Sequence, residues 1–86
     1  MDDRILITFF TTTQAMRMED CCRRAGENGR LIPVPGKISA GCGLGWMTEK
    51  RCRERMISFM TAQKLEWQGI YELEGILKGQ AKKNGD

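Results

Sequence analysis

Histidine is absent from the 86 residues of the sequence. A Ser-His or Cys-His pair, in which the imidazole activates the nucleophile, therefore cannot form within one chain, and zinc sites with histidine ligands are excluded as well. Cysteine occurs only at positions 21, 22, 42 and 52, and no two cysteines have the C-x-x-C spacing of zinc knuckles and thioredoxin-type dithiols. We therefore expect no metal site, and any chemistry is that of a single cysteine.

Long apolar runs and a strong charge of one sign are also missing. The run Ile5-Leu6-Ile7 is far shorter than the roughly 20 residues that span a bilayer, and Met1-Asp2-Asp3 is acidic where a secretory signal is basic. Fourteen Lys and Arg against eleven Asp and Glu give a net charge of +3 that is spread along the chain. Nucleic-acid-binding proteins concentrate basic residues on one face. We therefore expect a cytoplasmic protein with reduced cysteines that binds no membrane, no nucleic acid and no cofactor.

The residues that are present predict one small α+β domain over 1–74, followed by a mobile polar tail over 75–86. Apolar residues at spacings of three and four predict two helices, and β-branched and aromatic residues predict strands. Threonines 11–13 offer a cap for the first helix, and Thr48 offers one for the second. The expected elements are strands at 4–10, 30–35, 42–47 and 67–73 and helices at 14–25 and 48–63.

This order of elements, βαββαβ, is typical of a ferredoxin-like sandwich. Such a fold has a mostly antiparallel sheet with two helices on one face and leaves the other face uncovered. Pro33 and Pro35 lack a backbone N–H group, so we expect their strand at an edge of the sheet.

The segment Ser39-Ala40-Gly41-Cys42-Gly43-Leu44 is the most informative part of the chain. Glycines on both sides leave room to approach the sulfur of Cys42, and glycine backbone can turn N–H groups toward an anion. Ser39 offers a further hydrogen bond, and Lys37 is the nearest cation. The alternative interpretation is that Cys42 is a small apolar residue at the start of a strand and that the glycines serve only the turn. The residues alone leave both interpretations open.

The other three cysteines have structural interpretations. Cys22 and Cys52 lie on the apolar stripes of the two expected helices, where they fill the core. Cys21 is expected to be half-exposed. Neighbouring side chains on a helix point about 100° apart, which argues against a metal site formed by Cys21 and Cys22. A soft-metal chaperone would need Cys21 or a second chain as a further ligand, and it ranks below the other interpretations.

Four segments of the chain match a known family: Ile7-Thr8-Phe9 with the threonines that follow, Arg30-Leu31-Ile32-Pro33-Val34-Pro35, Ile38-Ser39-Ala40-Gly41-Cys42-Gly43-Leu44 and Gly69-Ile70-Tyr71. In these segments the chain resembles the selenium/sulfur (Se/S) carrier protein-like family, a small domain of unknown function. The resemblance covers roughly residues 4–73 and departs from the family at Gly45-Trp46 and in the three additional cysteines. It implies that Cys42, in the motif S-x-x-C-G-L, carries sulfur or selenium as a persulfide or selenosulfide. It also implies a cytoplasmic protein that works beside a cysteine desulfurase or selenium-donating protein and an acceptor enzyme.

The leading hypothesis is therefore a stoichiometric thiol carrier that is not an enzyme. Cys42 would accept the outer sulfur of a donor persulfide, Gly41 and Gly43 would provide room and amide donors, and Ser39 would steady the anion. The alternative is a non-catalytic protein-interaction or regulatory module with a structural cysteine, because the fold by itself decides no function. The sequence predicts no particular oligomeric state.

Overall fold

The computed structural model describes residues 3–36, 38 and 41–73. The elements follow the expected order of strands and helices, with a short 3-10 turn before the second helix. They are β1 (Arg4–Thr8), α1 (Thr12–Ala25), β2 (Arg30–Pro33), β3 (Leu44–Glu49), η1 (Lys50–Cys52), α2 (Arg53–Ala62) and β4 (Gly69–Glu72).

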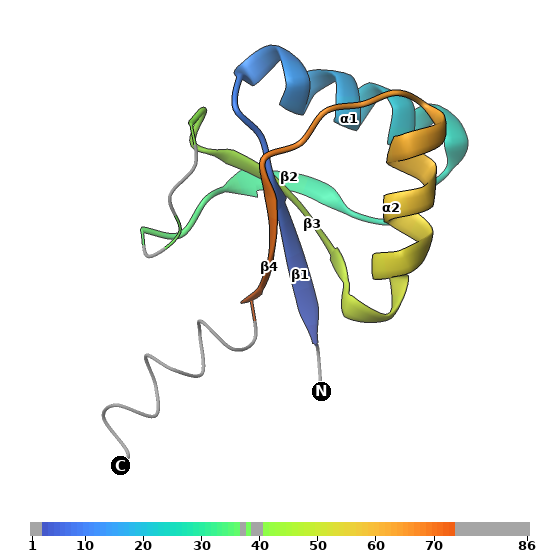
Figure 1. Cartoon of the computed structure of the whole chain (residues 1–86). Coiled ribbons are helices and arrows are strands. Elements are labelled where there is room, and N and C mark those ends of the chain that lie inside the picture. Colours follow the sequence, from blue (N-terminus) through green and yellow to red (C-terminus); the bar gives the residue numbers. More distant parts are fainter. Residues whose placement is uncertain (1–2, 37, 39–40, 74–86) are drawn as a thin grey trace.

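The four strands form one sheet in the order β2-β3-β1-β4, and each neighbouring pair is antiparallel (Figure 1). β3 lies between β1 and β2, and β1 lies between β3 and β4, so each β-α-β connection passes over one intervening strand. The predicted α+β class and the antiparallel sheet are confirmed. β2 is an edge strand, as its prolines predicted.

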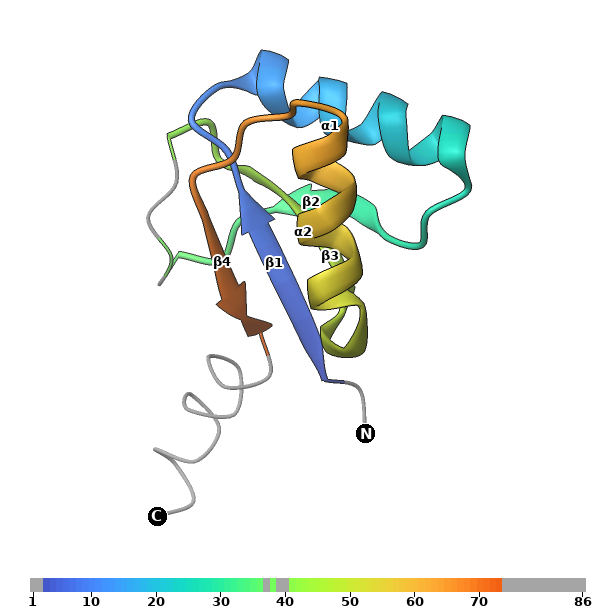
Figure 2. The same cartoon turned by 45° about the vertical axis from the view of Figure 1, so that its right-hand side comes forward.

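Both helices pack on one face of the sheet. Ile7 of β1 and Trp46 of β3 are cross-strand partners, so their side chains share this face. They form the main core with Ala15, Met18 and Cys22 of α1 and Met56 and Met60 of α2. Figure 2 shows α2 running along this face in front of β3.

The other face of the sheet carries a smaller apolar cluster. Leu6 of β1, Ile38 and Leu73 are buried there, and Met47 and Tyr71 pack against them. Loop and strand-end residues therefore cover part of the face that lacks helices.

Helix α1 has the predicted threonine cap at its start and a glycine cap at its end. Thr11 accepts a hydrogen bond from the backbone N–H of Gln14 at 3.1 Å, and the Gln14 side chain accepts one from the Thr11 N–H at 3.4 Å. This reciprocal pair is a capping box, which satisfies N–H groups that have no partner within the helix. Gly26 ends the helix in the left-handed conformation, with φ at 74°.

The predicted role of Thr48 as a helix cap is wrong. Thr48 belongs to β3, pairs with Ile5 across the sheet and is 4% exposed. Its hydroxyl donates to the carbonyl oxygen of Asn28 at 3.0 Å, so it joins the sheet instead of starting a helix. Helix α2 begins at Arg53 because β3 continues to Glu49 to complete its pairing with β1.

The remaining boundaries differ by small shifts. β1 ends at Thr8, β2 ends at Pro33, and β4 begins at Gly69, so these three strands are shorter than expected. The predicted tail at 75–86 lies outside the described residues. No helix in the described part of the chain has the length and apolarity that a membrane crossing requires.

Candidate functional site

Cys42 lies two residues before β3, in the bend that leads into the sheet. The bend is connected to the end of β2 by a hydrogen bond from the Val34 N–H to the Gly43 carbonyl oxygen, at 2.9 Å. Gly43 has a φ of 79°, a left-handed conformation that residues with a side chain adopt only at a cost. The sequence therefore needs glycine at position 43 to direct the chain from Cys42 into β3.

The backbone of Leu44 holds the Cys42 sulfur. The Leu44 N–H donates to Sγ at 3.4 Å, and Sγ lies 3.5 Å from the Leu44 carbonyl oxygen. A thiol donates to the carbonyl oxygen, whereas a sulfur anion accepts from the N–H, so this residue offers a partner to both forms. The Cys42 side chain is half-buried and packs against the main core. Its sulfur is thus held in place at the sheet end without being fully enclosed.

Gly41 lies in close contact with the chain segment that follows β1. A Cβ atom at this position would come within 2.5 Å of the Phe10 carbonyl oxygen, which leaves no room for a side chain. The Gly41 N–H donates to Oε1 of Gln68 at 3.2 Å. Gly41 therefore holds the cysteine segment, residues 41–43, against Phe10 after β1 and Gln68 before β4.

An exposed aromatic side chain adjoins this segment. Phe10 is 57% exposed, and together with Leu65, Glu66 and Trp67 it lines a shallow hollow of about 430 Å³. Gln68 follows these residues and bonds Gly41, so the hollow lies next to the cysteine segment.

Cys22 is fully buried, whereas Cys42 is half-buried. The Cys22 side chain lies in the main core, and its burial raises the pKa of the thiol from 9.0 to about 12, with the nearby Glu27 carboxylate and Cys21 adding to the effect. A thiol with such a high pKa stays protonated and is a poor nucleophile. The prediction that Cys22 fills the core is confirmed.

Cys21 and Cys52 are half-buried beside the same core. Cys52 lies at the start of α2, with its sulfur 4.0 Å from a carboxylate oxygen of Glu49. All four cysteines are free thiols. Among the described residues, no three His, Cys, Asp or Glu side chains are grouped closely enough to hold a metal ion.

The structure places three of the sequence-predicted site residues side by side and leaves two undescribed. Gly41, Cys42 and Gly43 form the bend before β3, whereas Ser39 and Lys37 lie outside the described residues. Sequence reasoning missed the Leu44 N–H and the Gln68 side chain as partners of this bend. Leu44 belongs to the quoted motif, but only the folded geometry turns its N–H toward the sulfur, and Gln68 approaches from the far end of the chain.

One comparison with known proteins gives a match. The sequence model of the family described as "Putative Se/S carrier protein-like" matches residues 4–72, which include the strands and helices named above, from β1 to β4, and the bend with Cys42. No curated protein and no solved structure matches the chain significantly.

Proposed function

Because the chain belongs to the family described as putative Se/S carrier protein-like, we propose that it carries sulfur or selenium on Cys42 as a persulfide or selenosulfide. The observation that supports this residue is the position of its sulfur. It lies half-buried at a bend of the chain, with a backbone N–H at 3.4 Å to stabilise negative charge. A carrier needs a sulfur that a partner can reach and that is held in one place.

Loading is a transfer of sulfane sulfur with no net oxidation. The Cys42 thiolate attacks the outer sulfur of a donor persulfide, R–S–SH. The donor S–S bond breaks as the new S–S bond forms, and R–S⁻ leaves with both electrons of the old bond. The product is Cys42–S–SH, and a selenosulfide donor gives Cys42–S–SeH in the same way. The Leu44 N–H stabilises the thiolate before attack.

Delivery repeats the same chemistry in the other direction. A thiolate of the acceptor attacks the outer atom of the loaded group, and Cys42 leaves as a thiolate beside the Leu44 N–H. The chain has no histidine to act as a base, so the proton transfers fall to the donor and the acceptor. In this proposal each chain carries one atom per transfer and returns to the free thiolate, so it acts as a stoichiometric carrier and not as an enzyme.

The partners that suit this role are a cysteine desulfurase or a selenium-donating protein on one side and an acceptor enzyme on the other, in the cytoplasm. Burial removes Cys22 from competition because its thiol is fully enclosed and has a raised pKa. Cys21 and Cys52 share the half-buried state of Cys42, so they are the appropriate internal comparisons.

The test is the stoichiometry of loading with radiolabelled sulfur. The reduced protein is incubated with a cysteine desulfurase and ³⁵S-cysteine, separated from the donor, and counted before and after reduction. We expect one labelled sulfur per chain, released by reductant, in the parent and in Cys52→Ser, and background label in Cys42→Ser. Equal labelling of Cys42→Ser and the parent would contradict the proposal and favour the protein-interaction module with a structural cysteine.

A further inference from the structure

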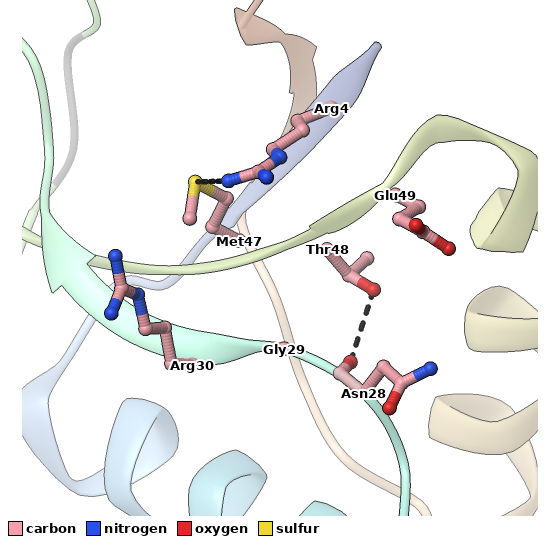
Figure 3. A pocket seen from close by; sticks show the side chains of 7 residues that line it. All are labelled: Arg4, Asn28, Gly29, Arg30, Met47, Thr48 and Glu49. Carbon is pink, nitrogen blue, oxygen red and sulfur yellow. Dashed lines mark hydrogen bonds between the residues drawn. The ribbon is translucent and has the colours of Figure 1, made fainter. Parts of the chain in front are cut away.

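The loop between α1 and β2 contains an asparagine that is followed by a glycine, Asn28-Gly29. Both residues are exposed and line a cavity of about 260 Å³ beside the end of β3, so water reaches them (Figure 3). A glycine has no Cβ atom that would shield its nitrogen from the side chain of the preceding residue. An asparagine amide, which is chemically labile, is therefore most open to attack by the following backbone nitrogen when that nitrogen belongs to glycine.

The two groups that would react are not engaged within the described part of the chain. There, neither the side-chain amide of Asn28 nor the N–H of Gly29 forms a hydrogen bond. β2 and its pairing with β3 begin one residue later, at Arg30, so the Gly29 nitrogen lies outside the ladder of the sheet. The side-chain carbonyl carbon of Asn28 and the nitrogen that would attack it are thus both open to reaction.

The backbone around this pair is attached closely to β3. The hydroxyl of Thr48, a residue that is 4% exposed, donates to the Asn28 carbonyl oxygen at 3.0 Å, and Figure 3 shows this bond next to the projecting side chain of Asn28. Gly29 has a φ of 134°, and a Cβ atom there would collide with the indole of Trp46 and come within 2.6 Å of the Met47 carbonyl oxygen. The start of β2 therefore fits against β3 without spare room.

From these features we infer that Asn28 deamidates spontaneously in the folded protein and that its isoaspartate product weakens the attachment of β2 to β3. Hydroxide removes the Gly29 amide proton, and the nitrogen attacks the side-chain carbonyl carbon of Asn28. The bond from this carbon to the side-chain nitrogen breaks, ammonia leaves with a proton taken from water, and a cyclic imide forms. Water then opens the ring at either carbonyl to give aspartate or isoaspartate, with no oxidation or reduction. This reaction is independent of the proposed sulfur transfer.

The isoaspartate product does not fit the contacts of the parent chain. In isoaspartate the backbone runs through the former side chain, which inserts one extra carbon atom between residues 28 and 29. Gly29 has no room to move toward Trp46, so the start of β2 must shift. The buried Thr48 hydroxyl then loses the backbone carbonyl that it bonds, which is costly for a polar group shielded from water. Aspartate, the other product, keeps the normal backbone and both contacts.

The test is peptide mapping of protein that has been kept warm at mildly alkaline pH. Trypsin releases residues 25–30 as one peptide, because Arg24 and Arg30 are its cleavage sites, and a mildly acidic digest stops the hydroxide-dependent step. We expect this peptide to gain the mass difference between an amide and an acid, with isoaspartate detected by an isoaspartyl methyltransferase, and we expect no gain in Asn28→Gln. No gain in the parent, or an equal gain in Asn28→Gln, would overturn the inference.

Mapping is needed because Asn84-Gly85 is a second pair of the same kind, outside the described residues. A change in the mass of the whole chain therefore does not identify the site.

Two valine variants test whether the reaction belongs to the folded protein. Thr48→Val removes the hydroxyl that holds the Asn28 carbonyl and should speed the deamidation of Asn28 several-fold. Thr8→Val is the matched control, because Thr8 is also a buried strand residue, and its hydroxyl bonds the Gly69 carbonyl oxygen at 3.4 Å instead. Equal acceleration in both variants would show that the reaction requires general unfolding, and it would overturn the inference for the folded protein.

The weakened attachment of β2 is measured on the isoaspartate form after it has been separated from the parent by chromatography. Its urea midpoint should be lower than that of Asn28→Asp, which represents the other product with an unaltered backbone. Equal midpoints for the two would overturn the inferred effect on β2.

Discussion

Glycine occupies the positions on both sides of Cys42 for two different physical reasons. At position 43 the backbone is left-handed, with a φ of 79° and open space where a side chain would be. At position 41 the backbone contacts the Phe10 carbonyl oxygen so closely that a Cβ atom has no room. Together they place the sulfur at the end of the sheet, where the Leu44 N–H contacts it.

Substitution of Gly41 tests this close contact. Gly41→Ala should lower the free energy of unfolding by roughly 1–3 kcal/mol, because the added Cβ forces the bend away from Phe10. Sulfur loading of Cys42 should slow as the bend moves. Urea unfolding and ³⁵S loading measure the two effects. Gly36→Ala is the matched control, since a Cβ atom there meets nothing within 4 Å and its stability should stay the same or rise slightly. Equal stability of the two variants would contradict this account.

Because the pKa of the buried Cys22 thiol is raised, the free energy of unfolding depends on pH in the alkaline range. The thiol keeps its proton in the folded protein up to a pKa of about 12, whereas the unfolded chain loses the proton near the ordinary value of 9.0. The stabilisation is complete below pH 9 and is lost as the pH rises toward 12, since the unfolded state then binds fewer protons. The largest slope for one group is about 1.4 kcal/mol per pH unit.

Two substitutions isolate this effect. Cys22→Ala should cost roughly 1–2 kcal/mol near neutral pH because it leaves a small void in the core, and Cys22→Val tests the loss of the thiol with the core filled. In both, the free energy of unfolding should fall less steeply above pH 9 than in the parent. Denaturant unfolding at a series of alkaline pH values measures the slopes. Parallel curves for the parent and both variants would contradict the raised pKa of Cys22.

At the scale of the elements, the two ends of α1 follow from local capping rules, whereas the start of α2 does not. Thr11 and Gln14 form the capping box that the threonine run suggested, and Gly26 ends the helix in the conformation that glycine favours. Helix α2 has no side-chain cap, and β3 takes Thr48, the residue that had the chemistry of a cap. Pairing with Ile5 of β1 and the hydrogen bond to Asn28 outweigh the local preference of Thr48 to cap a helix. Both partners are distant in the sequence, so a short stretch of sequence does not predict them.

The cap of α1 is a third target for substitution. Thr11→Ala should destabilise the protein by about 1 kcal/mol, because the Gln14 N–H loses its acceptor. Thr13→Ala is the matched control: Thr13 is an exposed residue inside the same helix, where alanine has the higher helix propensity. The urea midpoints should therefore move in opposite directions. A larger loss of stability in Thr13→Ala than in Thr11→Ala would contradict the role of Thr11 as the helix cap.

At the scale of the whole molecule, the sheet separates two kinds of chemistry. Cys42 lies before the first residue of β3, and Asn28 is held by Thr48 near its last residue. The length of β3 lies between the proposed sulfur site and the proposed deamidation site. The two sites can therefore be altered one at a time.

The sequence was sufficient for the class of fold and for the candidate cysteine. Periodicity and composition predicted six elements in the right order, and glycines on both sides distinguished Cys42 from Cys22 on a helical stripe. The contacts around the sulfur could not be predicted, because Gln68 and Phe10 reach Gly41 only after the sheet forms. The hydrogen bond between Thr48 and Asn28 was also missed.

The central claim is that Cys42 is the residue that carries the transferred atom. The most direct measurement is peptide mapping by mass spectrometry after the reduced protein has been loaded by a cysteine desulfurase and its free thiols have been blocked. The account predicts a gain of one sulfur on the peptide that contains Cys42, and little on the peptides of Cys21, Cys22 and Cys52. Sulfur shared equally between Cys42 and Cys52, or found mainly on another cysteine, would contradict it.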